Sequence, residues 1–195
     1  MNRLISSLFI AIAAAMLLSG CAGYQLGSVK PSVYAGIDKL HVPPFKNDTL
    51  EPRISSLVTN AVLKEIQADG TYAVSNRSNC DAVLVGRITE IKKYQLRAAR
   101  TDTLESRELK LRLYVYFYLE DPVTGERIYT TLDDTESSKD KGIDSDPALK
   151  AKQGRVYGST IQFVDPSYQV GERSAISVAA EDLAKKLVSH IANGW

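Results

Sequence analysis

The residues best suited to chemistry are few, and their spacing matches no catalytic or metal-binding pattern. The chain contains two histidines, His41 and His190, and neither has a cysteine or carboxylate at the spacing that zinc ligands require. The sequence has no G-x-S-x-G nucleophile motif and no glycine-rich phosphate-binding loop. It therefore predicts a protein that is not an enzyme, with no catalytic residue, no metal site and no cofactor.

Cys21 is the residue whose surroundings predict a definite modification. Arg3 gives the N-terminus a positive charge, residues 4–18 are nearly all apolar, and Leu18-Ser19-Gly20 precede the cysteine. This order is typical of a secretory signal peptide, and the apolar run is shorter than the roughly 20 residues that span a bilayer. The tetrapeptide ending in Cys21 resembles the bacterial lipobox, so we expect cleavage after residue 20 and lipidation of the Cys21 thiol.

Lipidation of Cys21 would hold the mature protein to a membrane. Two or three acyl chains anchor stably because each buried methylene contributes about 0.8 kcal/mol. Ala22 follows the cysteine, where aspartate usually marks proteobacterial lipoproteins that stay in the inner membrane. We therefore expect the outer membrane, with the domain facing the periplasm. Cys80 is then left without an intramolecular partner, and we interpret it as a small residue at the entry of a strand.

The composition predicts one globular domain without general affinity for nucleic acid. The expected organisation is a signal peptide at 1–20, a lipidated tether at 21–37 and a single domain at 38–195. The chain has 24 Lys and Arg and 23 Asp and Glu, so the loss of Arg3 leaves the mature protein formally neutral. A neutral surface argues against a polyanion-binding protein.

Hydrophobic periodicity predicts an α+β fold. Apolar residues at helical spacing predict helices over residues 49–69 and 171–192, with Asp48 or Thr49 capping the first and Gly70 ending it. A strand is expected at 107–120, where residues 109–120 alternate strictly between apolar side chains, nearly all aliphatic, and polar or aromatic ones, which indicates a half-buried strand. Further strands are expected at 38–45, 71–75, 81–97, 126–133 and 158–164, with a loop at 134–156. We expect a two-layer sandwich, with two α-helices packed on one face of a mostly antiparallel four- to five-stranded sheet.

Positive charge gathers between residues 92 and 112, which are expected to form two strands and their hairpin. This segment has seven cations against three acids in an otherwise neutral chain. Such cations could bind phosphate groups, since arginine at a strand end makes paired hydrogen bonds to phosphate. Equally, they could be ordinary solvated charges that protect an edge strand. The candidate phosphate-binding residues are Lys92, Lys93, Arg97, Arg100, Arg107, Lys110 and Arg112.

Three tyrosines, Tyr114, Tyr116 and Tyr118, follow two of these cations on the non-aliphatic row of the predicted strand. We expect this row to face away from the core. Adjacent aromatic rings are costly to leave in water, so the row should be covered either by residues 135–165 of the same chain or by a partner protein. Tyrosine is enriched in protein interfaces.

Several motifs, taken in order, resemble one family. Gly20–Tyr24 and then Leu40–Pro52 are similar to a "GCGY" start followed by a "V-P-x-F-x-N-x-T-x-E-P" stretch. The similarity continues through Asp81–Thr89, Asp121–Glu126 and the C-terminal segment around Ala180–Ala184. These motifs resemble the lipopolysaccharide-assembly lipoprotein LptE family over most of the mature chain. The chain departs from the better-known members at residues 135–170, which are longer and more polar.

The resemblance implies a function without catalysis at the outer membrane. Members of that family sit as a plug within the β-barrel protein LptD, help to assemble the barrel, and support delivery of lipopolysaccharide to the outer leaflet. The resemblance therefore implies an LptD-like barrel partner, lipopolysaccharide as a candidate ligand, and a membrane attachment through lipid on Cys21.

A second resemblance gives an alternative function. The Val-Pro-Pro-Phe strand followed by a helix is also similar to the TolB N-terminal-type domain of lipoproteins that activate cell-wall synthases or serve other envelope export machines. Such activators usually carry a long proline-rich tether. Here 16 residues separate Cys21 from the first expected strand, a reach of roughly 55 Å at most. The short tether favours a partner embedded in the same membrane.

Overall fold

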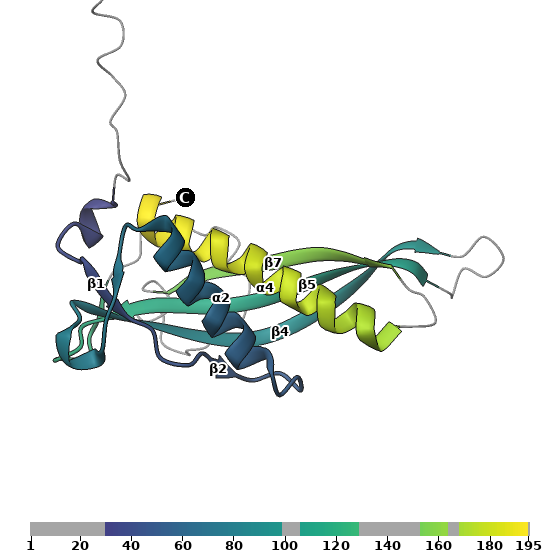
Figure 1. Ribbon diagram of the computed structural model, residues 1–195, viewed down its shortest axis with the longest axis horizontal. Helices are drawn as coiled ribbons and strands as arrows, with labels where there is room; N and C mark the ends of the chain where they lie inside the picture. The colour runs from purple at the N-terminus through teal and green to yellow at the C-terminus, as the bar shows by residue number, and fades with distance from the viewer. Residues whose placement is uncertain (1–29, 99–105, 129–152, 164–167, 195) are drawn as a thin grey trace, which may run out of the picture.

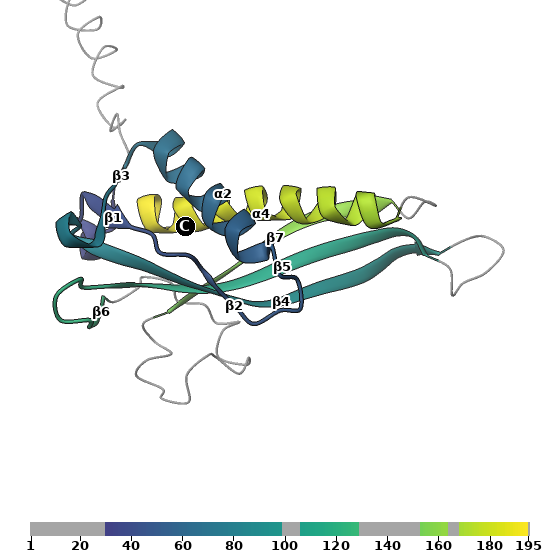
Figure 2. The same cartoon turned by 60° about the horizontal axis from the view of Figure 1, so that its bottom comes forward.

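The structure is a computed structural model that describes residues 30–98, 106–128, 153–163 and 168–194. Two helices, α2 (Ile54–Asp69) and α4 (Tyr168–Asn193), lie on one face of a long sheet. Figures 1 and 2 show the opposite face of the sheet without a described helix. The predicted α+β class, with helices in one layer and the sheet in the other, is confirmed. None of the described helices is long and apolar enough to cross a membrane.

The described sheet has seven strands and is mixed, so the predicted sheet of four to five mostly antiparallel strands is too small and too uniform. Its order is β3-β1-β4-β5-β6, with β2 also paired to β4 and β7 also paired to β5. The strands are β1 (Lys39–His41), β2 (Lys46–Asn47), β3 (Ala73–Val74), β4 (Ala82–Ala98), β5 (Ser106–Glu120), β6 (Arg127–Ile128) and β7 (Gly154–Phe163).

The parallel pairs come from the N-terminal strands. β1 pairs in parallel with β3 and β4, and β2 pairs in parallel with β4. Pro43 and Pro44 cannot donate ladder hydrogen bonds, so the strand expected at 38–45 is replaced by two shorter ones. α2 lies between β2 and β3 in the chain and carries it back across the sheet. Parallel strands need such a crossover connection, which is usually a helix.

The alternation predicted for residues 107–120 is confirmed in β5. β5 pairs antiparallel with β4 on one side and with β7 on the other. β7 starts at Gly154, four residues before the predicted strand. The aliphatic row of β5 is buried in the core beneath the helices, and its members are Leu111, Leu113, Val115, Phe117 and Leu119.

The helices bury the predicted apolar stripes, but α2 begins later than expected. Gly70 ends α2 in the left-handed region at φ 76°, and its N–H donates to the Ile66 carbonyl at 3.1 Å. The predicted cap at Asp48 or Thr49 is wrong, because the helix begins at Ile54 with no side-chain cap hydrogen bond. Asp48 instead forms an ion pair with Arg87 on β4. α4 starts at Tyr168, three residues before its predicted start.

Ordered contacts to the domain begin ahead of Asp38. Tyr34, in the short 3-10 helix η2 (Ser32–Tyr34), is buried in the core. The Lys30 ammonium lies 2.7 Å from the Asp38 carboxylate and 4.9 Å from the centre of the Tyr72 ring. Lys30, Tyr34 and Ile37 therefore contact the domain from within the segment expected to be the tether.

Asp81 fastens this N-terminal region to the start of β4. One of its carboxylate oxygens accepts hydrogen bonds from the backbone N–H groups of Asp38, at 3.0 Å, and of Lys39, at 2.8 Å. These hydrogen bonds favour the charged form and lower the pKa of Asp81. The carboxylate thus holds β1 in register beside β4.

Candidate functional site: a tyrosine–cation face of the sheet

The face of the sheet opposite the helices gathers tyrosine and cationic side chains from neighbouring strands. The register places Tyr114 between Glu90 and Tyr157, and Tyr116 between Arg87 and Arg155. Directly paired residues point to the same face. We call this surface the tyrosine–cation face and define it by Arg87, Lys92, Tyr94, Lys110, Arg112, Tyr114, Tyr116, Tyr118, Arg127, Arg155 and Tyr157.

The predicted tyrosine row lies on this face but is less exposed than expected. Tyr114 and Tyr116 are only 7% and 5% exposed, and Tyr118 is half-buried. The Arg155 guanidinium lies 4.7 Å from the centre of the Tyr114 ring and 5.5 Å from that of Tyr116. Arg155 belongs to the segment 135–165 that was one of the two expected covers. Tyr118, 3.9 Å from the Arg127 guanidinium, is the most accessible member of the row.

Arg112 is held between two aromatic rings. Its guanidinium lies 5.1 Å from the ring centre of Tyr94 on one neighbouring strand and 5.1 Å from that of Tyr157 on the other. Such cation–π contacts contribute roughly 0.5–1 kcal/mol each at exposed sites. Among the described residues, no acceptor meets the buried Arg112 Nε. The Tyr94 and Tyr157 rings therefore hold the Arg112 guanidinium in place, while its Nε–H has no acceptor among the described residues.

Hydroxyl contacts connect the same aromatic rings. The Tyr94 and Tyr114 hydroxyl oxygens lie 3.3 Å apart. This hydrogen bond raises the pKa of Tyr94. Burial acts to raise the pKa of Tyr114, but hydrogen bonds with Tyr94 and Arg112 outweigh it, so the pKa of Tyr114 is lowered overall. The positively charged surroundings thus stabilise negative charge on this face.

The structure brings together some of the seven predicted cations and separates others. Lys92 and Arg112 are opposite each other in the register and share the tyrosine–cation face with Lys110. Lys93 lies on the helix side, opposite Leu111. Lys92 also forms an ion pair with Glu90 at 2.9 Å, which raises the pKa of Lys92. The Arg97 and Arg107 backbones belong to β4 and β5 but their side chains are outside the description, as is all of Arg100.

Exposed apolar side chains lie on the same two strands, β4 and β7, that flank the cations of β5. Tyr94 is 39% exposed and Leu96 46%, and on β7 Tyr157 is 42% exposed and Ile161 55%. The strand register places Tyr94, Tyr157 and Ile161 on the tyrosine–cation face, while Leu96 lies at a register shift of β4. The surface therefore offers positive charge beside apolar area, a combination that suits an anionic amphiphile or an interface with another protein.

Arg127, Arg155 and Tyr157 belong to this face but were not predicted from the sequence. Residues 154–156 were placed in a polar loop, so the partnership of β7 with β5 was missed. The alternation of Arg155 and Tyr157 with Val156 and Gly158 was the available signal, but it is short and lies next to a polar segment.

Within the described ranges, no three His, Cys, Asp or Glu side chains are placed to hold a metal ion. The His41 ring Nδ1 lies 3.1 Å from the Ser75 carbonyl oxygen, a contact that ties β1 to the chain after β3. The geometry of the described residues thus supplies binding surfaces and structural contacts. The absence of enzymatic activity stays a prediction.

Solved structures share this fold at low sequence identity. Protein XCC0632 from Xanthomonas campestris is 9% identical with a TM-score of 0.52, covering 85% of this chain and 86% of that one. The hypothetical protein CT253 from Chlamydia trachomatis is 9% identical with a TM-score of 0.50, covering 80% and 96%. A minor lipoprotein from Acinetobacter baumannii is 16% identical with a TM-score of 0.49, covering 80% and 94%. The first two likenesses show a shared α+β fold and no more.

The family is shown by the sequence itself. Residues 37–191 match the family model described as LptE, lipopolysaccharide-assembly. The chain therefore belongs to the LptE lipopolysaccharide-assembly family, as its motifs predicted. No curated protein matches the chain significantly in sequence.

Proposed function

We propose that this protein is an outer-membrane lipoprotein, anchored through Cys21 and facing the periplasm. In this proposal it helps to assemble and plug an LptD-like β-barrel and supports the delivery of lipopolysaccharide to the outer leaflet. The family match over residues 37–191 carries the proposal. The lipobox-like sequence before Cys21 and the tyrosine–cation face support it.

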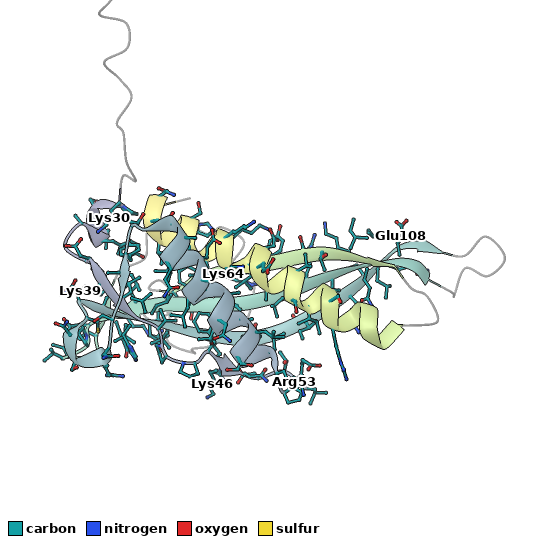
Figure 3. All side chains as sticks on the ribbon, viewed as in Figure 1. Lys30, Lys39, Lys46, Arg53, Lys64 and Glu108 are labelled. Carbon is teal, nitrogen blue, oxygen red and sulfur yellow. The ribbon has the colours of Figure 1, made fainter. Side chains whose placement is uncertain are left out.

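The geometry of the anchor favours a partner in the same membrane. Eight residues separate Cys21 from Lys30, which already contacts the domain, and at about 3.5 Å each they reach at most roughly 28 Å. Figure 3 places Lys30 at one end of the molecule and Glu108 near the other. The 15 residues of β5 span about 50 Å at roughly 3.3 Å per residue, more than the ~30 Å of a bilayer core.

The alternative is a TolB-N-like lipoprotein that activates a cell-wall synthase or serves another export machine. The short anchor argues against it, because such activators usually carry a long tether, whereas here roughly 28 Å of chain at most separates Cys21 from the end of the domain at Lys30. Stimulation of peptidoglycan polymerisation by the purified protein would favour this alternative.

The partnership predicts a barrel crosslink from the exposed part of the tyrosine–cation face. A photocrosslinking amino acid at Tyr157, which is 42% exposed, should capture a large outer-membrane barrel protein in cells. The same substitution at Tyr114, which is 7% exposed, is the matched control and should give little product. Products containing only soluble periplasmic proteins would contradict the partnership.

Lipopolysaccharide binding predicts a charge-dependent loss at three described cations. Changing Lys92, Lys110 and Arg112 to glutamine should weaken binding of purified lipopolysaccharide about tenfold or more, because charge-assisted hydrogen bonds to phosphate are lost. The wild-type affinity should fall as salt is raised. Glutamine at the exposed Lys39, Lys46 and Lys64, which lie elsewhere (Figure 3), removes the same charge and should change little. Equal affinity in both triple variants would remove this site from the proposal.

A further inference from the structure

A groove runs between the two helices on the outer side of the helix layer. It has a volume of about 500 Å³, and its lining comes from α2 and α4. Figure 1 shows these helices side by side over the sheet, where they pack against each other. Their main apolar stripes are already buried in the core, so the groove is a second surface of the same two helices.

The lining has the same periodicity on both helices. It consists of positions 57, 60, 61, 64 and 65 on α2 and of positions 177, 180, 181, 184 and 185 on α4. Each set follows the spacing i, i+3, i+4, i+7 and i+8, which marks one face of an α-helix. Side-chain ridges at this spacing are the surface on which another helix packs. The shape of the groove therefore fits an α-helix.

The floor of the groove is apolar. Leu57 and Ala61 of α2 and Ala180 and Ala184 of α4 form it. Leu57 and Ala61 are only partly buried, although both pack against the core. Some of their apolar area is therefore left for a partner to cover.

The rim of the groove carries charges of both signs that have no partner in the described chain. The charged residues at the rim are Lys64, Glu65, Glu181 and Lys185. Among the described residues none of these four forms an ion pair. By contrast, Asp182 and Lys186, one position further along α4 and at the same spacing of four residues, are paired at 2.7 Å. The rim therefore offers two acids and two bases to a ligand with the opposite pattern.

We propose that this groove, which the proposed function does not use, binds an amphipathic α-helix of a partner protein. The apolar side of that helix packs on the floor. Its flanks carry acids opposite Lys64 and Lys185 and bases opposite Glu65 and Glu181. Grooves of this kind recognise amphipathic helices through anchors at i, i+3, i+4 and i+7, and the rim charges fix the orientation of the bound helix and exclude wrong partners.

Other occupants fit the groove less well. A rim with two acids and two bases has no net charge, so it gives an anionic lipid surface no electrostatic attraction. A second copy of the chain would present the same concave surface, and two facing grooves would leave their floors out of contact. A single helix is convex and fills the groove.

Photocrosslinking in cells tests what occupies the groove. A photocrosslinking amino acid at Asn60, which is exposed and lines the groove, should give a product in which the crosslinked peptide of the partner comes from an amphipathic helix. The matched control is Gln67, an exposed residue of α2 outside the groove, which should not give this product. Crosslinks to lipid, to a second copy of the chain or to a strand of a barrel would overturn the proposal, as would equal yields at the two positions.

A synthetic peptide of the crosslinked segment tests the charge pattern with the purified protein. Glu181→Lys combined with Lys185→Glu keeps the net charge and should weaken peptide binding about tenfold, because two attractive pairs become repulsive. Arg53→Glu combined with Glu126→Lys also keeps the net charge, alters exposed residues outside the groove, and should bind like wild type.

A variant of the floor tests the shape of the groove independently of charge. Ala61→Gln places a longer side chain on the floor with little change in helix propensity, and it should also weaken binding of the peptide. Thermal unfolding of all three variants should match wild type, which separates docking from folding. Wild-type affinity in either groove variant would overturn the proposal.

Discussion

Replacing Phe45 with alanine should lower the free energy of unfolding by about 3–5 kcal/mol, the usual cost of deleting a buried aromatic ring. Phe45 is 2% exposed and lies between α2 and β4. Its ring occupies the space above Gly86, where an added Cβ would come within 2.3 Å of the ring. The backbone hydrogen bonds of Phe45 with Thr59 and Ser55 remain possible for alanine, so the loss reports packing.

Urea unfolding monitored by circular dichroism would measure this loss. Leu50→Ala removes an exposed side chain from the adjoining loop and should change stability by less than about 0.5 kcal/mol. Gly86→Ala should destabilise the wild type yet cost much less beside Phe45→Ala, because the ring that it meets is gone. Strictly additive effects at Phe45 and Gly86 would contradict the proposed contact.

The Phe45–Gly86 contact explains part of the family motif in physical terms. Phe45 and Asn47 both come from the "V-P-x-F-x-N-x-T-x-E-P" stretch. Phe45 fills the core, while Asn47 and Thr49 hold the turn before α2. These motif residues therefore specify the packing of β2 and the turn before α2.

Elements with a long local period could be predicted from the sequence. The twelve-residue alternation of β5 and the apolar stripes of α2 and α4 each repeat enough to identify both the element and its buried face. Gly70 was predicted as the end of α2 because glycine accepts a positive φ at little cost. These are local properties of the chain.

Strand pairing and contacts between residues far apart in the chain could not be predicted from local sequence patterns. β1, β2 and β3 contain two or three residues each, too few for a period, and their parallel pairing depends on the path of α2. The Arg155 guanidinium that lies near the Tyr114 and Tyr116 rings belongs to a residue 39 positions beyond Tyr116 in the chain. The split of Lys92 and Lys93 between the two sheet faces follows from strand alternation. The register shift between Ile88 and Glu90 determines that Lys92, and not Lys93, lies opposite Arg112.

Strand alternation shows why a cationic run is weak evidence for a site. Lys92 and Lys93 are adjacent in sequence and point to opposite faces, so only Lys92 joins Arg112. The observed face gains Arg155 and Arg127 in exchange, from strands that bring no charge run of their own. Positive charge on this surface is therefore a product of strand pairing.

The approach of α4 to β7 gives the second large expected effect. Gly158→Ala should destabilise the protein by about 3 kcal/mol, the upper end of the usual overpacking cost. A Cβ at residue 158 would lie 1.9 Å from the Ala179 carbonyl oxygen and 2.7 Å from the Leu183 backbone nitrogen. Both are helix backbone atoms, so no side-chain rotation can relieve the clash and α4 itself must move.

Movement of α4 would also disturb contacts that close the edge of β7. Asp182 accepts from the Ser159 N–H at 2.8 Å, and Lys186 donates to the Tyr157 carbonyl at 3.3 Å. Urea unfolding of Gly158→Ala should therefore show a clearly lower midpoint than wild type. Gly36→Ala is the matched control, since a Cβ there meets no atom within 4 Å, and it should leave the midpoint nearly unchanged. Equal midpoints for the two variants would mean that α4 does not lie this close to the sheet in solution.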